Sequence, residues 1–153
     1  MSNINAHYIS VTAIIVKDGK FLITRRNLHE KNFPGRWTVP GGKLSTEDYS
    51  NLKKNEDGLW YEVLENTVRR EVKEETGLDI DNIRYLTNMT FIRADGIPTL
   101  VLSFFCDSKS GEVRLSNELI DHAWINLEEA RKYDLIDGIV EELKMVNNVL
   151  NLR

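Results

Sequence analysis

The chain lacks the features that would place it in several specialised classes of protein. It has one cysteine among 153 residues, so neither an intramolecular disulfide nor a zinc site built from several cysteines can form. That residue, Cys106, lies in the apolar run 100–106 and is expected to be a small buried hydrophobic side chain. No segment approaches the roughly 18 apolar residues of a membrane span, and residues 1–7 lack the basic and apolar regions of a secretory signal. A cytoplasmic location without a membrane partner is the default expectation.

An excess of positive charge is also missing. Lysine and arginine number 20 against 24 aspartates and glutamates, which gives a net charge of −4. This balance argues against a broad electrostatic grip on nucleic acid, so no extended nucleic-acid partner is expected. It leaves room for a small phosphorylated ligand, because a bound metal can supply positive charge locally. With 41% hydrophobic residues and no low-complexity tract, residues 1–153 are expected to form one domain with a substantial core.

The order of apolar and turn residues predicts a mixed α/β domain. Residues 8–16 and 21–24 are rich in β-branched and apolar side chains and flank Asp18-Gly19, which predicts a hairpin. Residues 58–76 repeat apolar side chains at helical spacing and are followed by a glycine, the usual helix end. The polar stretch 45–57 is interpreted as a surface excursion before this helix. The remaining predicted elements are strands at 83–86, 90–92, 99–106 and 122–126, a helical turn at 127–132 and a helix at 137–150.

The predicted helix 58–76 carries a concentration of carboxylates. Glu71, Glu74 and Glu75 occupy positions i, i+3 and i+4, which places all three on one helical face. Such a cluster is costly against a protein surface unless a cation neutralises it. Mg²⁺ fits this need, because it prefers oxygen ligands and is held by one or two carboxylates together with substrate phosphates. Helices rich in Glu, Lys and Arg are also common as solvated, salt-bridged faces, so the spacing alone leaves both interpretations open.

The residues around this cluster carry a specific resemblance. Glu62 is followed, after seven residues, by Arg70-Glu71-Val72-Lys73-Glu74-Glu75-Thr76-Gly77-Leu78. This stretch resembles the signature of the Nudix hydrolases, the MutT-like family, which reads G-x5-E-x7-R-E-U-x-E-E-x-G-U with U an aliphatic residue. The segment 35–44 and the hairpin ending in Arg25-Arg26 are also similar to the family, so the resemblance spans about residues 8–150.

One departure from the signature concerns its glycine. The family places five residues between the glycine and the first glutamate, whereas 19 residues separate Gly42 from Glu62 here. The simplest interpretation is an insertion of 14 residues in the loop before the helix. The register of the helix is unaffected, but the approach of Gly41 and Gly42 to the carboxylates depends on the geometry of that loop.

The resemblance implies both a fold and a chemistry. The fold is a Nudix-like three-layer α/β/α sandwich with a mixed β-sheet. The activity is hydrolysis of a nucleoside diphosphate linked to another group, with Mg²⁺ as the metal and Mn²⁺ as an alternative. Glu74 and Glu75 correspond to metal ligands of the family, and Glu71 to a ligand or to the base that activates water. Arg70 corresponds to a residue that orients a glutamate by ion pairing.

Further site residues are predicted from outside the helix. The resemblance implies an additional metal-binding carboxylate, for which Glu118 is the candidate and Asp121 the alternative. For both acids, capping of residues 119–122 or plain surface charge is the competing interpretation. Four residues are candidates for substrate binding, the arginines through phosphates and the glycines through close backbone approach: Arg25, Arg26, Gly41 and Gly42. For the arginines, plain charge at the end of an exposed strand is the competing interpretation.

The aromatic and histidine residues give weaker predictions. Five aromatic side chains are candidates for stacking on a base, with core packing as the competing interpretation for each: Phe33, Trp37, Trp60, Tyr61 and Phe91. Trp124 is expected to anchor its strand in the core. The three histidines, His7, His29 and His122, lack metal-ligand spacing and are expected to have no role in the site.

Three rival functions follow from the same residues. A catalytically silent nucleotide-binding module is disfavoured, because a binder has no need for three clustered carboxylates. An enzyme acting as a pyrophosphohydrolase on the 5′ end of RNA is disfavoured by the negative net charge. A structural domain with an incidental charged helix predicts no stabilisation by Mg²⁺. The sequence leaves the substrate within the nucleotide class, the number of metal ions and a homodimer open.

Overall fold

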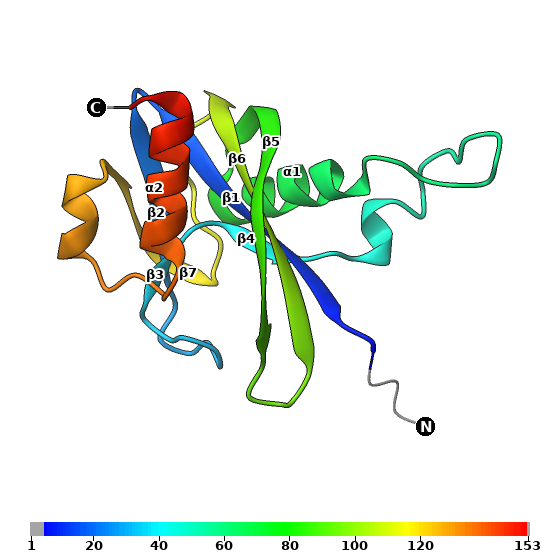
Figure 1. Ribbon diagram of the computed structural model, residues 1–153, viewed down its shortest axis with the longest axis horizontal. Coiled ribbons are helices and arrows are strands. Elements are labelled where there is room, and N and C mark those ends of the chain that lie inside the picture. Colours follow the sequence, from blue (N-terminus) through cyan, green and yellow to red (C-terminus); the bar gives the residue numbers. More distant parts are fainter. Residues whose placement is uncertain (1–4, 153) are drawn as a thin grey trace.

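The computed structural model describes residues 5–152 and confirms the α/β class with a mixed sheet (Figure 1). The seven strands are β1 (Tyr8–Lys17), β2 (Lys20–Arg26), β3 (Trp37–Thr38), β4 (Gly41–Lys43), β5 (Asp79–Ile92), β6 (Pro98–Ser110) and β7 (Leu119–Ile125). The main path of the sheet is β3-β2-β1-β6-β5, with β4 paired to β1 and β7 paired to β2. β1 and β6 run parallel, whereas every other pair is antiparallel.

The hairpin of β1 and β2 has the turn that its sequence predicts. Lys17 pairs with Lys20, so the turn consists of Asp18 and Gly19, which have φ values of 51° and 75°. Two consecutive left-handed residues give the turn a twist that matches the twist of the flanking strands. Aspartate followed by glycine is one of the few residue pairs that adopt this conformation at low cost.

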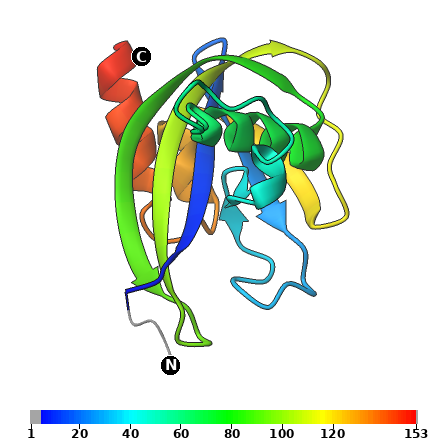
Figure 2. The ribbon, with the colours of Figure 1, turned by 90° about the vertical axis from the view of Figure 1, so that its right-hand side faces the viewer.

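Two helices cover opposite faces of the sheet (Figures 1 and 2). α1 (Val63–Thr76) packs Val68 and Val72 on one face, and α2 (Ile139–Leu150) packs Leu143 and Val146 on the other. Strand residues alternate between the two faces because side chains of a strand point in opposite directions in turn. The α1 side includes Val11, Ala13, Ile15, Leu22, Phe104 and Cys106, and the α2 side includes Ile14, Phe21, Ile23, Phe105 and Ile125. Cys106 is buried, as expected.

The predicted bounds of β5 and of α1 were wrong, and each error has a local cause. The strands predicted at 83–86 and 90–92 are parts of the single strand β5, whose pairing with β6 is interrupted by three register shifts. Such irregularities disturb the regular pattern of side chains along a strand. The helix predicted from residue 58 begins at Val63, because Gly58 and Glu62 have φ values of 79° and 58°. Leu59, an apolar residue within the predicted helix, is 50% exposed.

The short strand β4 positions the site, because β1 changes partner along its length. Residues 16–17 of β1 pair with β2, whereas residues 10–12 pair with β4. β4 therefore runs beside the first half of β1 and underneath α1. Gly41 is required at this place, because a Cβ on it would overlap the carbonyl oxygen of Val11. Within residues 5–152, neither helix combines the length and the apolar character needed to cross a membrane.

Candidate active site

A cleft of about 590 Å³ lies between α1 and β4, and the predicted glutamates line it. Glu71, Glu74 and Glu75 face it from α1, and Glu118 faces it from the residue before β7. Their environments differ: the side chain of Glu71 is 14% exposed and that of Glu74 is 60% exposed, whereas Glu75 as a residue is 8% exposed. Folding thus brings Glu118, which lies 43 positions after Glu75 in the chain, to the three glutamates of one helix face.

The charges of these carboxylates oppose one another. Burial, followed by the charges of Glu71 and Glu118, raises the pKa of Glu75 to about 8. Burial also raises the pKa of Glu71, against the opposing effect of the neighbouring Arg70. A buried carboxylate beside like charges is stabilised by protonation, by hydrogen bonds or by a cation. The cleft therefore has an excess of negative charge that a bound cation would relieve.

Two glycines of β4 let the strand approach this helix closely. The backbone N–H of Gly41 donates a hydrogen bond to the carboxylate of Glu75. A Cβ on Gly42 would overlap the carboxylate of Glu71, so any larger residue at this position would displace that side chain. Gly41 and Gly42 thus allow β4 to lie against the glutamates, and their role in substrate binding stays a prediction.

Arg70 connects the carboxylates to the loop that follows β4. Its Nη1 lies 2.8 Å from Oε1 of Glu71 and 3.1 Å from Oε2 of Glu74. Its Nη2 donates to the carbonyl oxygen of Lys43 at 3.0 Å and to Oδ2 of Asp48 at 3.1 Å. Its Nε donates to the other oxygen of Asp48, which completes a two-pronged ion pair. The hydrogen bond with Asp48 is the largest of the effects that raise the pKa of Arg70.

Asp48 is a site residue that the sequence interpretation missed. It ends the 3₁₀ turn η1 (Thr46–Asp48), and its side chain is 1% exposed. Besides Arg70, it accepts hydrogen bonds from the backbone N–H of Ser45 at 2.9 Å and from the hydroxyl of Thr67 at 2.8 Å. Burial alone would raise the pKa of Asp48, but these bonds hold it below its ordinary value. The carboxylate of Asp48 is therefore a fixed anion beneath Arg70. The prediction that all of residues 45–57 form a surface excursion was wrong for Asp48, because its side chain is buried.

Glu62 does not take the place next to Arg70. It precedes α1 in a left-handed conformation, is exposed, and forms no ion pair within residues 5–152. A signal for the alternative was present in the sequence: five residues separate Gly42 from Asp48, which is the family's own spacing between its glycine and its first acid. The additional residues follow Asp48, because the chain leaves Asp48 for an exposed loop and returns at Val63 (Figure 1).

The other predicted polar residues divide between the cleft and the scaffold. Arg26 lines the cleft and forms an ion pair with Glu30 at 3.3 Å. Arg25 does not line it; its Nε donates to the carbonyl oxygen of Gly35 at 2.8 Å, which ties the loop after β2 to the strand. Asp121 is exposed on β7 and does not line the cleft, so only Glu118 of the two candidate acids does so.

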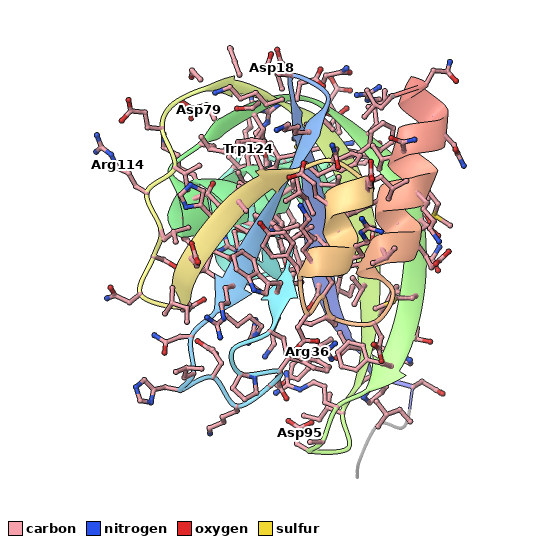
Figure 3. The ribbon with its side chains drawn as sticks, turned by 90° about the vertical axis from the view of Figure 1, so that its left-hand side faces the viewer. Asp18, Arg36, Asp79, Asp95, Arg114 and Trp124 are labelled. Atoms are coloured by element: carbon pink, nitrogen blue, oxygen red, sulfur yellow. The ribbon has the colours of Figure 1, made fainter. Side chains whose placement is uncertain are left out.

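A second cavity of about 260 Å³ adjoins the carboxylate cleft. The two share Arg26, Gly41, Gly42, Lys43 and Glu75 in their walls. Of the five candidate stacking residues, Phe33 and Phe91 line this cavity. Trp37 instead packs on the core and against Tyr133, and Trp60 packs against Tyr49 on the exposed loop. Tyr61 lines neither cavity, and Trp124 packs against the core on β7, as expected (Figure 3).

The oxygen atoms of the cleft that could bind a metal fit a hard divalent cation. They are carboxylate and carbonyl oxygens, the ligand type that Mg²⁺ prefers. Among residues 5–152, no three His, Cys, Asp or Glu side chains converge into a preformed metal cage. Mg²⁺ does not need one, since it keeps several waters and takes one or two protein carboxylates besides substrate phosphates. Arg70 lies between Glu71 and Glu74 and would have to share them with such an ion.

The buried charge of Glu75 predicts a cost to stability in the absence of metal. Because its pKa is raised from 4.5 to about 8, the neutral form stabilises the fold below pH 4.5, and this stability is lost as the pH rises to about 8. Glu75→Gln should therefore raise the metal-free melting temperature little at pH 5 and more at pH 8. For a chain of this length, a gain of one kcal/mol in the free energy of unfolding raises the melting temperature by about 2–4 °C. Thermal unfolding in EDTA at both pH values measures this. A difference that does not grow with pH would contradict it.

The sheet, the two covering helices and the carboxylate cleft define an α/β protein with a candidate site rich in acidic side chains. The NUDIX domain family matches residues 6–144. The nucleoside triphosphatase NudI of Escherichia coli K12 is 32% identical over 136 residues, which cover 82% of this chain and 86% of the relative. The chain belongs to the Nudix hydrolase family, and it is an enzyme of that class.

Solved structures agree on the fold. The MutT NUDIX hydrolase of Burkholderia pseudomallei has a TM-score of 0.73 at 24% identity, with 93% of this chain and 99% of that chain covered. The NUDIX domain of Shewanella oneidensis NrtR, solved with ADP ribose, has a TM-score of 0.72 at 20% identity, with 95% and 90% covered. At these identities the likeness concerns the fold. Family membership supports hydrolysis of a pyrophosphate linkage in a small nucleotide substrate, with a divalent metal.

Proposed function

We propose that this chain is a Mg²⁺-dependent hydrolase that cleaves the pyrophosphate linkage of a nucleoside triphosphate or of a related nucleoside diphosphate derivative. The observation that carries the proposal is the cleft in which Glu71, Glu74, Glu75 and Glu118 meet, with Glu75 buried among like charges. The similarity to the nucleoside triphosphatase NudI favours a nucleoside triphosphate within this class.

In this proposal the glutamates hold the metal and the cations of the cleft bind the phosphates. Glu74, Glu75 and Glu118 would share Mg²⁺, which would supply charge neutralisation, polarisation of phosphorus and a more acidic water, and Glu71 would be a further ligand or the base. Arg26 and Lys43 line the same cleft and would pair with phosphate oxygens. Arg70 would set the direction of Glu71 and Glu74, because its Nη1 reaches both.

The reaction is the addition of water across a P–O–P bond. The water oxygen bonds to one phosphorus, the bridging oxygen leaves with the other, and a carboxylate of the cleft accepts the proton of the water. Glu71 is well placed for that proton, since its side chain is largely buried beside Gly42 and its pKa is raised by burial. The products would be a nucleoside monophosphate and a phosphorylated leaving group.

The test is a hydrolysis screen of the full chain with and without Mg²⁺. Nucleoside triphosphates, nucleotide sugars, ADP-ribose and dinucleoside polyphosphates are incubated with the protein, and the products are resolved by ion-exchange chromatography. We expect metal-dependent release of a nucleoside monophosphate, and EDTA should abolish it. Nucleotide binding by calorimetry without turnover of any compound would instead favour a silent binding module. Faster cleavage of 5′-triphosphorylated RNA with a steep salt dependence would favour the RNA enzyme.

A further inference from the structure

The strand β5 leaves one edge of the sheet open. Within residues 5–152, β5 pairs with β6 alone, so the N–H and C=O groups along its other side have no partner strand. With 14 residues it is the longest strand of the sheet. Figure 2 shows its second half (green) as the outermost strand, which extends past α2 toward the β5–β6 turn. An open edge of this kind is a template for pairing with a further strand, and proteins usually protect it.

The first half of β5 carries such protection. The three charged residues of the strand, Asp79, Asp81 and Arg84, all lie in this half. The three register shifts in its pairing with β6 all lie before Thr87. Charges and irregular pairing both hinder the addition of a strand at an edge. The first half of β5 is therefore poorly suited to pairing with another chain.

The second half of β5 lacks both kinds of protection. Residues 87–92 read Thr-Asn-Met-Thr-Phe-Ile, which includes no charge, proline or glycine. Each of them pairs with β6 in unbroken register, so the segment is regular. Met89, Phe91 and Ile92 are 41%, 39% and 74% exposed. A regular, uncharged edge that exposes apolar side chains is suited to a partner strand rather than to water.

The side chains of this segment complement those of a second copy. A two-fold axis through Met89 and perpendicular to the sheet would place two β5 strands antiparallel, with the same face of each sheet on the same side. Asn88 would then lie opposite Thr90 of the other copy, and Thr87 opposite Phe91. Polar side chains would meet each other, and a β-branched side chain would meet an aromatic ring, both of which stabilise a sheet.

We propose that residues 87–92 of β5 pair with the same segment of a second copy, so that the two sheets form one continuous sheet across a homodimer. The same segment meets the needs of both partners, because each copy supplies an open edge and an uncharged strand. The charges nearest to the segment, Arg84 and Arg93, lie beyond its two ends. The interface does not depend on the proposed function, since none of residues 87–92 lines the carboxylate cleft.

The test compares the wild type with two double variants by sedimentation equilibrium over a range of micromolar concentrations. We expect the wild type to have twice the chain mass of 17.7 kDa. Asn88→Lys with Thr90→Lys would place lysine opposite lysine at both symmetry-related pairs and should weaken the dimer about tenfold or more. Asn88→Lys with Thr90→Glu is the matched control, because it places lysine opposite glutamate and should keep the dimer. Both side chains are exposed, so both variants should keep the wild-type melting temperature.

A disulfide gives an independent readout of the register. Met89→Cys would bring two cysteines together at the two-fold axis, within the range that a disulfide spans. Copper-catalysed air oxidation should therefore link the variant into a covalent dimer. The wild type should stay unlinked, since its one cysteine, Cys106, is buried.

The outcomes that would overturn the proposal are distinct. A wild type that stays at 17.7 kDa throughout would exclude the second copy and leave the edge to a strand of another protein. A dimer that persists equally in both double variants would place the interface elsewhere on the molecule. Equal weakening in both, or a dimeric Met89→Cys protein that forms no disulfide, would refute the antiparallel pairing about Met89.

Discussion

Glu75→Gln is expected to lower kcat by about 10³-fold or more, which corresponds to about 4 kcal/mol of lost transition-state stabilisation. Glu75 is 8% exposed, receives the N–H of Gly41, and lies among the charges of Glu71 and Glu118. Glutamine has nearly the same shape but no charge with which to hold a divalent cation. The variant should remain folded, because it removes a buried charge rather than packing.

Steady-state hydrolysis as a function of Mg²⁺ concentration measures this effect. The matched control is Glu65→Gln, which changes a glutamate of the same helix outside the cleft and should keep activity within about twofold. Glu74→Gln should give a smaller loss than Glu75→Gln, because its side chain is 60% exposed and water can replace part of its role. Near-wild-type turnover in both Glu74→Gln and Glu75→Gln, with unchanged melting curves, would rule out the assignment of these glutamates.

Asp48→Asn is the second change with a large expected effect. It should lower kcat/KM by about 10–100-fold, the usual consequence of losing a residue that orients a metal ligand. Asparagine would remove the negative charge of Asp48 beside Arg70, and its amide group would face the N–H and O–H groups that now donate hydrogen bonds to Asp48. Arg70 would then pair more fully with Glu71 and Glu74, so more Mg²⁺ should be needed for half-maximal activity.

Glu62→Gln provides the sharp contrast for this prediction. Glu62 is the first glutamate of the signature by its spacing to Arg70, yet it is exposed and unpaired with that arginine. Its variant should therefore retain wild-type kcat/KM and Mg²⁺ dependence. Asp48→Glu should recover part of the activity, since it restores the charge. If Glu62→Gln is the impaired variant and Asp48→Asn the silent one, the roles of these two acids are reversed. If Asp48→Asn changes only the melting temperature and not the Mg²⁺ requirement, Asp48 has a structural role alone.

The position of Asp48 changes how the long loop is understood. The signature is interrupted after its first acid rather than before it, so residues 49–61 form a loop between two parts that remain in contact. Long surface insertions cost little free energy, because the entropic cost of loop closure grows only slowly with length. The loop can therefore be long without disturbing the ion pair between Asp48 and Arg70.

Much of this protein was determined by its sequence alone. The turn of the first hairpin follows from Asp18-Gly19, and the shared face of Glu71, Glu74 and Glu75 follows from helical spacing, because both depend on residues that are close in the chain. The family followed from the same local motif. The single domain over residues 1–153 and the homodimer stay predictions.

Other features were decided only by the tertiary structure. Asp48 replaces Glu62 beneath Arg70, although Glu62 has the signature's spacing to the arginine, because the identity of a partner depends on which carboxylate folding buries there. Phe33 and Phe91, rather than the tryptophans, line the second cavity. These residues come from separate segments of the chain. Their proximity results from the pairing of distant strands and the packing of α1 on β4, which no spacing along the sequence encodes.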